Sequence, residues 1–224
     1  MSVTTLVFDA YGTLFDIAAP ARRAAATRPD LAPIWPKLSE DWRRKQLEYT
    51  WLRSITGAYA DFAQITAEAL DWAMEAQHLT DPALRRDLLA LYDALDAFPE
   101  VPETLRLMKS RGLHLAILSN GTPAMLASAQ AAAGLTGLID TTLSVESVRI
   151  YKPHASVYAL VEAQIGAPPH EVLFVSSNGW DIAGAARFGF RTAWVNRSAA
   201  PQDRLPDGPL HRIPDLTHLP RLIA

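Results

Sequence analysis

Four short apolar runs, separated by stretches of helical periodicity, constrain the fold of this chain more than any other feature of its sequence. The runs span residues 3–8, 113–118, 172–175 and 191–195. Short continuous apolar runs with β-branched residues are typical of strands buried on both faces of a parallel sheet. Helical patterns, each closed by a glycine, lie between them at residues 102–111, 125–133 and 157–165. This alternation predicts right-handed βαβ units around a parallel sheet.

Residues 16–98 interrupt the alternation, because this stretch contains no convincing strand. Leu47, Trp51 and Ile55 recur at four-residue steps, and a second helical spacing is formed by Leu84, Leu88, Leu91 and Leu95. The sequence therefore predicts an α/β fold: a doubly wound, Rossmann-like parallel sheet made from residues 1–15 and 99–224, with an inserted helical cap of residues 16–98. A cap entered after the first strand would overhang the sheet edge where open α/β sheets bind ligands. A final edge strand is expected near residues 211–214.

The composition excludes several classes of protein. The 224 residues carry 21 Lys and Arg against 24 Asp and Glu, a net charge of −3, so neither a nucleic-acid nor a membrane partner is expected. There is no cysteine, which excludes disulfides, Cys-ligated zinc and thiol catalysis. No segment approaches the roughly 20 apolar residues that span a bilayer. The first residues indicate a strand rather than a signal peptide, so we expect a cytoplasmic protein.

Chemically useful side chains follow the predicted strands in chain order. Asp9 follows the first strand, Ser119 and Asn120 follow the second, and Lys152 precedes the third helical pattern. Asp181 follows the strand at 172–175. Each residue has an ordinary explanation, since Asp often caps turns and helices and a single Lys is usually solvated. Taken together, they place two carboxylates, an anion-receiving loop and a cation along one ordered series of strand ends.

This ordered set resembles the haloacid dehalogenase superfamily over essentially the whole chain. Most of its members are magnesium-dependent phosphatases, which carry Asp-x-Asp with the second Asp as general acid. Tyr11 stands at that position here, and tyrosine is a far weaker acid at neutral pH. The fourth motif offers Asn178 and one acid, Asp181, instead of paired acids. Because divalent cations require several oxygen ligands, we expect no metal and no other cofactor.

The motifs resemble the L-2-haloacid dehalogenases more specifically. They are Asp-x-Tyr-Gly-Thr-Leu-Phe-Asp from Asp9, the insert motif Trp42 to Ser54, Leu-Ser-Asn-Gly, Tyr-Lys-Pro and Val-Ser-Ser-Asn-x-Trp-Asp. A halide leaving group is stable without a proton, so loss of the general acid is compatible with halide displacement. The resemblance implies that Asp9 attacks Cα of a 2-haloalkanoic acid with inversion. Water then hydrolyses the aspartyl ester and releases a D-2-hydroxy acid.

The resemblance also implies how a carboxylate can attack an anionic substrate. Lys152 would hold Asp9 ionised and offset the repulsion between the two negative groups. Ser119 and the backbone at Ala10 and Tyr11 would receive the substrate carboxylate.

The halide would be received on the other side of the substrate. Arg43, reaching down from the insert, would bind it together with Asn120 and Trp180, because a guanidinium beside an aromatic edge suits a large, weakly hydrated anion. The alternative interpretation is a packing helix whose apolar residues form core alone, with Arg43 extending to solvent.

The resemblance assigns the hydrolytic water to Asp181, helped by Ser177 or Asn178. The family's supporting polar residues correspond to Thr13, Tyr158 and Ser176. Two other functions compete with this one: a magnesium-dependent small-molecule phosphatase, and a non-catalytic module that keeps the anion pocket. The expected partners are a small haloacid and halide, and the resemblance also suggests a homodimer.

Overall fold

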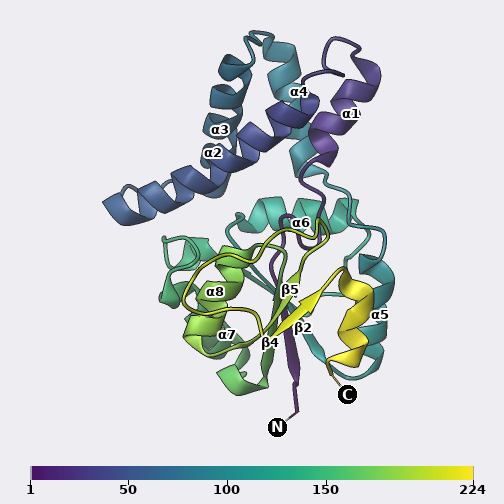
Figure 1. Ribbon diagram of the computed structural model, residues 1–224, viewed down its shortest axis with the longest axis vertical. Coiled ribbons are helices and arrows are strands. Elements are labelled where there is room, and N and C mark those ends of the chain that lie inside the picture. The colour runs from purple at the N-terminus through teal and green to yellow at the C-terminus, as the bar shows by residue number, and fades with distance from the viewer. Residues whose placement is uncertain (1, 224) are drawn as a thin grey trace.

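The computed structural model describes residues 2–223 and is built on a six-stranded parallel sheet (Figure 1). The strand order is β3-β2-β1-β4-β5-β6, and every neighbouring pair is parallel. The strands are β1 Thr5–Phe8, β2 His114–Ser119, β3 Thr141–Ser144, β4 Val172–Ser176, β5 Arg191–Val195 and β6 His211–Ile213. The four predicted strands and the edge strand near residue 211 are confirmed. Strand β3 was not predicted, because it buries only Leu143 and so lacks a continuous apolar run.

Helices cover both faces of this sheet (Figure 1). They are α5 Val101–Ser110, α6 Pro123–Ala132, α7 Ala155–Ile165 and α8 Gly179–Phe188, with 3-10 turns η1 Val145–Ser147, η2 Pro169–Glu171 and η3 Leu216–Arg221. The predicted helices at 102–111, 125–133 and 157–165 are present with small shifts at their ends. The glycines expected after them, Gly112, Gly134 and Gly166, all adopt positive φ, where a Cβ would be strained.

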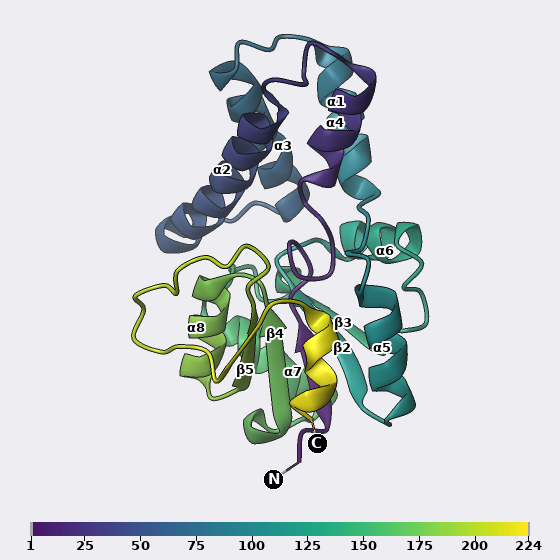
Figure 2. The same ribbon diagram turned by 45° about the vertical axis from the view of Figure 1, so that its right-hand side comes forward.

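Four helices lie between residues 16 and 98, above the carboxyl edge of the sheet (Figures 1 and 2). They are α1 Ala19–Thr27, α2 Trp35–Thr56, α3 Phe62–Ala76 and α4 Pro82–Asp93. They pack mainly on one another. The chain enters and leaves this layer through two adjacent segments, joined where the Asp16 amide donates to the Asp96 carbonyl and the Phe98 amide to the Leu14 carbonyl.

Helix α2 presents two different faces. The face buried against α3 carries Leu38, Trp42, Gln46 and Thr50. The apolar residues that predicted the helix, including Ile55, form a separate stripe one position further on. Ile55 is 81% exposed, so this apolar stripe is not the packing face of the helix.

The sheet changes winding direction at β1, which lies between β2 and β4. Phe8 is in register with Ile117 on one side and Val175 on the other. Asp9, Ser119 and Ser176 therefore meet at the same edge. In open α/β sheets this switch point is where ligands bind.

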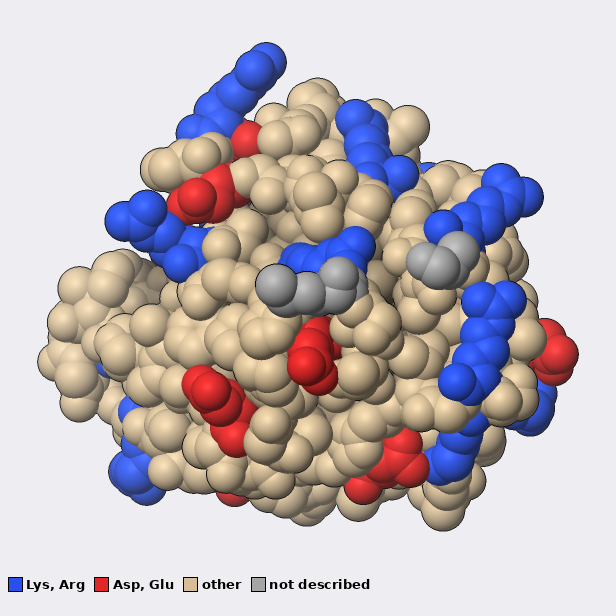
Figure 3. Space-filling view, turned by 90° about the horizontal axis from the view of Figure 1, so that it is seen from below, with Lys and Arg blue, Asp and Glu red and all other residues tan. Residues whose placement is uncertain are grey.

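The end of the molecule opposite the helical layer carries charged side chains of both signs (Figure 3). Figure 3 looks at that end, where basic and acidic side chains are interspersed among uncharged ones. Within residues 2–223, every helix is too short or too polar to cross a membrane.

Candidate active site

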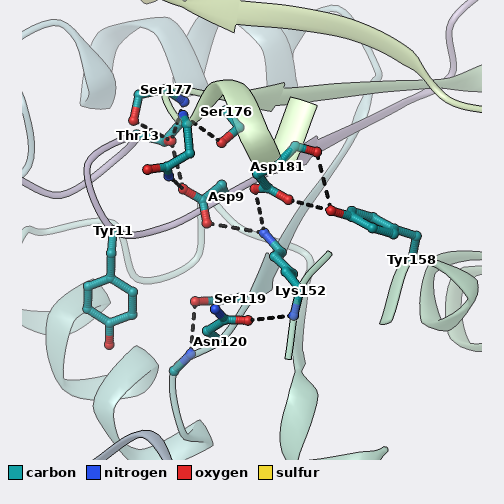
Figure 4. A network of polar contacts seen from close by, with 12 residues as sticks. Asp9, Tyr11, Thr13, Ser119, Asn120, Lys152, Tyr158, Ser176, Ser177 and Asp181 are labelled. Atoms are coloured by element: carbon teal, nitrogen blue, oxygen red, sulfur yellow. Dashed lines mark hydrogen bonds and ion pairs between the residues drawn. The ribbon is translucent and has the colours of Figure 1, made fainter. Parts of the chain in front are cut away.

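Asp9 carries the most completely coordinated carboxylate at the sheet edge (Figure 4). Its Oδ1 accepts a hydrogen bond from Lys152 Nζ at 3.1 Å. Its Oδ2 accepts from Thr13 Oγ1 and from Asn178 Nδ2, both at 2.9 Å. The residue is only 6% exposed. A buried carboxylate needs such donors to remain charged, and here they come from three different segments.

Lys152 lies between two carboxylates. Its Nζ is 3.1 Å from Asp9 Oδ1 and 2.9 Å from Asp181 Oδ2, and the residue is 1% exposed. Burial acts to lower the pKa of Lys152, but the charges and hydrogen bonds of Asp181 and Asp9 outweigh it and hold the pKa above its ordinary value. The ammonium therefore stays charged at neutral pH.

Asp181 is held from its other side by Tyr158. The Tyr158 hydroxyl donates to Asp181 Oδ1 at 2.8 Å. Burial raises the pKa of Asp181 to about 6, and Lys152 opposes that rise. Gly184 makes the contact possible, because a Cβ there would lie 2.5 Å from the Tyr158 hydroxyl oxygen.

The loop after β4 orients the groups that hold Asp9. Ser176 Oγ accepts from the Asn178 amide at 3.1 Å, and Thr13 Oγ1 accepts from the Ser177 amide at 2.8 Å. Thr13 also lies 3.2 Å from Ser177 Oγ. The Asn178 side chain thus reaches Asp9, while the oxygens of Asp181 are bound by Lys152 and Tyr158.

The loop after β2 contributes polar groups beside Lys152 (Figure 4). Ser119 is fully buried, and its Oγ accepts from the Gly121 amide at 3.1 Å. Asn120 Oδ1 accepts from the backbone amide of Lys152 at 3.2 Å. Asn120 therefore fixes the backbone of the residue whose ammonium binds Asp9.

Tyr11 points away from Asp9 and into the helical layer (Figure 4). Its ring lies 5.4 Å from that of Phe62 and stacks on that of Tyr92 at 5.7 Å. Burial raises the pKa of Tyr11 well above its usual value. The position that carries the general acid of phosphatases thus holds a neutral aromatic anchor, and the preceding Ala10 is fully buried.

Arg43 reaches the core from α2. Its Nη2 donates to the Tyr11 carbonyl at 3.4 Å, and its Nη1 donates to Gln46 Oε1 at 2.8 Å. Trp180 packs edge-on against Trp51, with ring centroids 5.4 Å apart. The structure therefore brings Arg43 over the loop that follows Asp9, and places Trp180 beside the apolar stripe of α2.

The sequence did not reveal two residues that orient the site. Gln46 is buried and binds Thr66 and Tyr92 as well as Arg43. Its only sequence signal is its position three residues after Arg43, which places both on neighbouring parts of one helix. Arg197 donates to the carbonyls of Gly12 and Thr13 and pairs with Glu100 at 2.6 Å. Nothing near Arg197 in sequence indicates those distant partners.

Gly184 was also missed, although it left a signal. A glycine inside a helix costs about 1 kcal/mol relative to alanine, which indicates a close approach by another group.

The donor set around Asp9 does not suit a divalent cation. The neighbours of its carboxylate are an ammonium, a hydroxyl and an amide nitrogen. Among residues 2–223, the structure groups no three His, Asp or Glu side chains as metal ligands. Lys152 occupies the space between the two buried carboxylates.

Comparisons of this chain with known proteins all identify haloacid dehalogenases as its relatives. A family model described as haloacid dehalogenase-like hydrolase matches residues 3–189. The chain is 42% identical to (S)-2-haloacid dehalogenase 1 of Pseudomonas sp. (strain CBS-3), over 99% of this chain and 96% of that protein. The crystal structure of a dehalogenase with an intermediate complex superposes with a TM-score of 0.94 at 40% identity, covering 100% and 98% of the two chains. The L-2-haloacid dehalogenase of Xanthobacter autotrophicus, with chloropropionic acid covalently bound, superposes with a TM-score of 0.89 at 38% identity, covering 99% and 98%.

Proposed function

Because this chain belongs to the haloacid dehalogenase-like hydrolases, alongside the (S)-2-haloacid dehalogenases, we propose that it hydrolyses short L-2-haloalkanoic acids to D-2-hydroxy acids. The observation that carries this proposal is the Asp9 carboxylate, fixed by Lys152, Thr13 and Asn178 at the switch point of the sheet. The reaction proceeds through an aspartyl ester and draws on this chain's own side chains.

Asp9 Oδ1 is the attacking oxygen in this proposal. Oδ2 accepts two hydrogen bonds, which engage both of its lone pairs, whereas Oδ1 accepts one. The free lone pair on Oδ1 forms a bond to Cα as the carbon–halogen bond breaks, and that bonding pair leaves with the halide. Lys152 reduces the repulsion between the carboxylates of enzyme and substrate.

The substrate carboxylate binds at the strand ends, by Ser119 and the backbone of Ala10 and Tyr11. Inversion requires the halide to depart on the side opposite Asp9. Arg43 lies over the loop that follows Asp9, which supports its role as the halide receptor, together with Asn120 and Trp180.

Hydrolysis restores the enzyme. Water adds to the Cγ carbonyl of the Asp9 ester, the acyl carbon–oxygen bond breaks, and the original Asp9 oxygen leaves in the hydroxy acid. Asp181 takes the proton from the water, aided by Ser177 or Asn178. A pKa near 6 suits a base that works at neutral pH. Tyr158 holds Asp181 in place, and Ser176 holds the loop after β4 that precedes it.

We also propose that residues 16–98 act as a cap over a catalytic core of residues 1–15 and 99–224. The cap excludes bulk water from the displacement and supplies Arg43. The division into cap and core is supported by the two paired segments that join the layers.

A homodimer formed through the insert helices is a further proposal. It is supported by Leu52, which is 50% exposed on α2, and light scattering tests it. A cytoplasmic location is likewise proposed, and fractionation of cells tests it.

The decisive experiment follows chloride release from L-2-chloropropionate in excess EDTA. We expect release to persist, the D isomer to remain unchanged, and Asp9→Asn to abolish turnover. A single turnover in oxygen-18 water labels the Asp9 peptide before it labels product. Failure to release halide from any short haloacid refutes the proposal, and magnesium-stimulated hydrolysis of aryl phosphates indicates a phosphatase instead.

A further inference from the structure

An apolar pocket of about 600 Å³ adjoins the site described above. Its walls come from the C-terminal half of α2, the 150–154 loop, the start of α8 and the loop after β5. We call this pocket the vestibule and define it by four of its residues: Trp51, Ile55, Trp180 and Leu205. Pockets of 300–1,000 Å³ with mainly apolar walls are typical of small-molecule sites.

The vestibule lies next to the reacting groups and shares wall residues with the site. Lys152, whose ammonium binds Asp9, also lines the vestibule, and Trp180 immediately precedes Asp181. On α2, Arg43, Leu47, Trp51 and Ile55 follow at four-residue steps, so each side chain lies beside the next one along the helix surface. This row runs from the proposed halide receptor to the vestibule wall.

Packing against α3 does not explain the apolar stripe of α2, and the end of the stripe at Ile55 is left exposed. The helix uses its other face against α3, and Ile55 is 81% exposed. Leu205, across the vestibule, is 45% exposed. Ile55 and Leu205 are thus two large apolar side chains exposed to solvent at one opening, which is typical of a binding surface.

The stereochemistry of the reaction identifies the occupant. At the attacked carbon, Asp9 approaches from one side, the halide leaves on the opposite side, and the carboxylate points toward Ser119. The hydrogen and the alkyl chain take the two remaining directions. Lys152 and Trp180 belong both to the site and to the wall of the vestibule, which makes the vestibule the neighbouring apolar space for that chain.

We propose that the vestibule binds the alkyl chain of 2-haloalkanoic acids longer than 2-halopropionate, so that Ile55 and Leu205 determine chain-length specificity. This inference rests on the proposed function. Each methylene buried against the apolar walls raises kcat/KM about fourfold relative to the shorter substrate. A three-carbon acid leaves most of the vestibule unfilled.

The test compares kcat/KM for L-2-chlorohexanoate with that for L-2-chloropropionate in the full-length protein. The double variant Ile55→Ser/Leu205→Ser lowers this ratio about tenfold and leaves the value for chloropropionate within about twofold. The matched control, Leu107→Ser/Leu210→Ser, alters two leucines that are also exposed but lie outside the vestibule, and leaves the ratio unchanged.

An unchanged ratio in the Ile55/Leu205 variant overturns the inference. If the ratio stays constant while light scattering shows a lower molar mass, the surface is a contact between two copies of the chain, and the inference is equally overturned. If the unmodified protein does not convert chloropropionate at all, the proposed function itself is refuted. Binding of unhalogenated hexanoate against propionate, followed by tryptophan fluorescence, then still tests the vestibule, because it requires no reaction.

Discussion

The guanidinium of Arg43 and the buried amide of Gln46 are joined by a 2.8 Å hydrogen bond across one turn of α2. The amide nitrogen of Gln46 is itself held by Thr66 Oγ1 at 2.7 Å. Arg43 is therefore fixed by an amide that cannot rotate freely, above the loop that follows Asp9. In its proposed role as halide receptor, Arg43 need not reorganise as charge develops on the leaving group.

Replacing Gln46 with Leu is expected to lower kcat about tenfold and to affect chloride more than bromide as leaving group. Chloride is the poorer leaving group, so its departure depends more on the charge of Arg43. The measurement is the ratio of kcat for L-2-chloropropionate and L-2-bromopropionate. Gln64→Leu serves as control, because Gln64 is exposed on α3 and its side-chain amide binds Glu68, away from Arg43. Equal losses for both halides contradict a positioning role for Gln46.

Removal of the Lys152 charge is expected to affect activity and stability together. In Lys152→Met, the Asp9 and Asp181 carboxylates remain buried without their shared cation, which costs about 3–5 kcal/mol of unfolding free energy. Turnover falls by at least about a thousandfold, because the nucleophile loses its counter-charge. Adding Asp9→Asn to this variant removes one uncompensated charge and restores part of the stability. Chemical denaturation measures both effects, and a double variant no more stable than Lys152→Met alone contradicts the account.

Because Asp181 is the proposed base, its pKa is expected to set the acid limb of the pH profile. Burial raises this pKa to about 6, so the carboxylate is ionised at pH 7 and takes up a proton as the pH falls through 6. Activity that needs the base therefore falls below pH 6, about tenfold per pH unit once protonation dominates. The hydrogen bond from Tyr158 lowers the pKa of Asp181, so Tyr158→Phe is expected to move the inflection to higher pH. The profile of kcat checks this, and a shift to lower pH excludes the assignment.

The positions of Asp9, Ser119 and Asp181 could be predicted from the sequence because each follows a recognisable strand. Asp9 ends an apolar run, and the carboxyl ends of parallel strands share one edge. Contacts between distant segments left no such signal. Arg197 binds the carbonyl of Thr13, 184 residues earlier, and no local pattern encodes that pairing.

The apolar periodicity predicted helix α2, but it did not show whether the apolar stripe of the helix is buried or faces solvent. The stripe through Trp51 and Ile55 was sufficient to predict a helix. A helix buried by this stripe would hide Ile55, whereas Ile55 is exposed and Gln46 on the neighbouring face is buried. Polar residues that hydrogen-bond to one another inside a helical layer can be buried without any apolar pattern in the sequence. This is why Gln46 was not predicted.

The close contact between Gly121 and Tyr11 links the core to the helical layer. A Cβ at Gly121 would lie 2.8 Å from the Tyr11 ring, which cannot move aside because Phe62 and Tyr92 pack against it. Gly121→Ala is therefore expected to destabilise the protein by about 1–3 kcal/mol through overpacking. In a Tyr11→Ala background the same substitution meets no ring, and its cost should fall close to zero. Thermal unfolding of the four members of this double-mutant cycle measures the coupling, and additive effects rule out the contact as the cause.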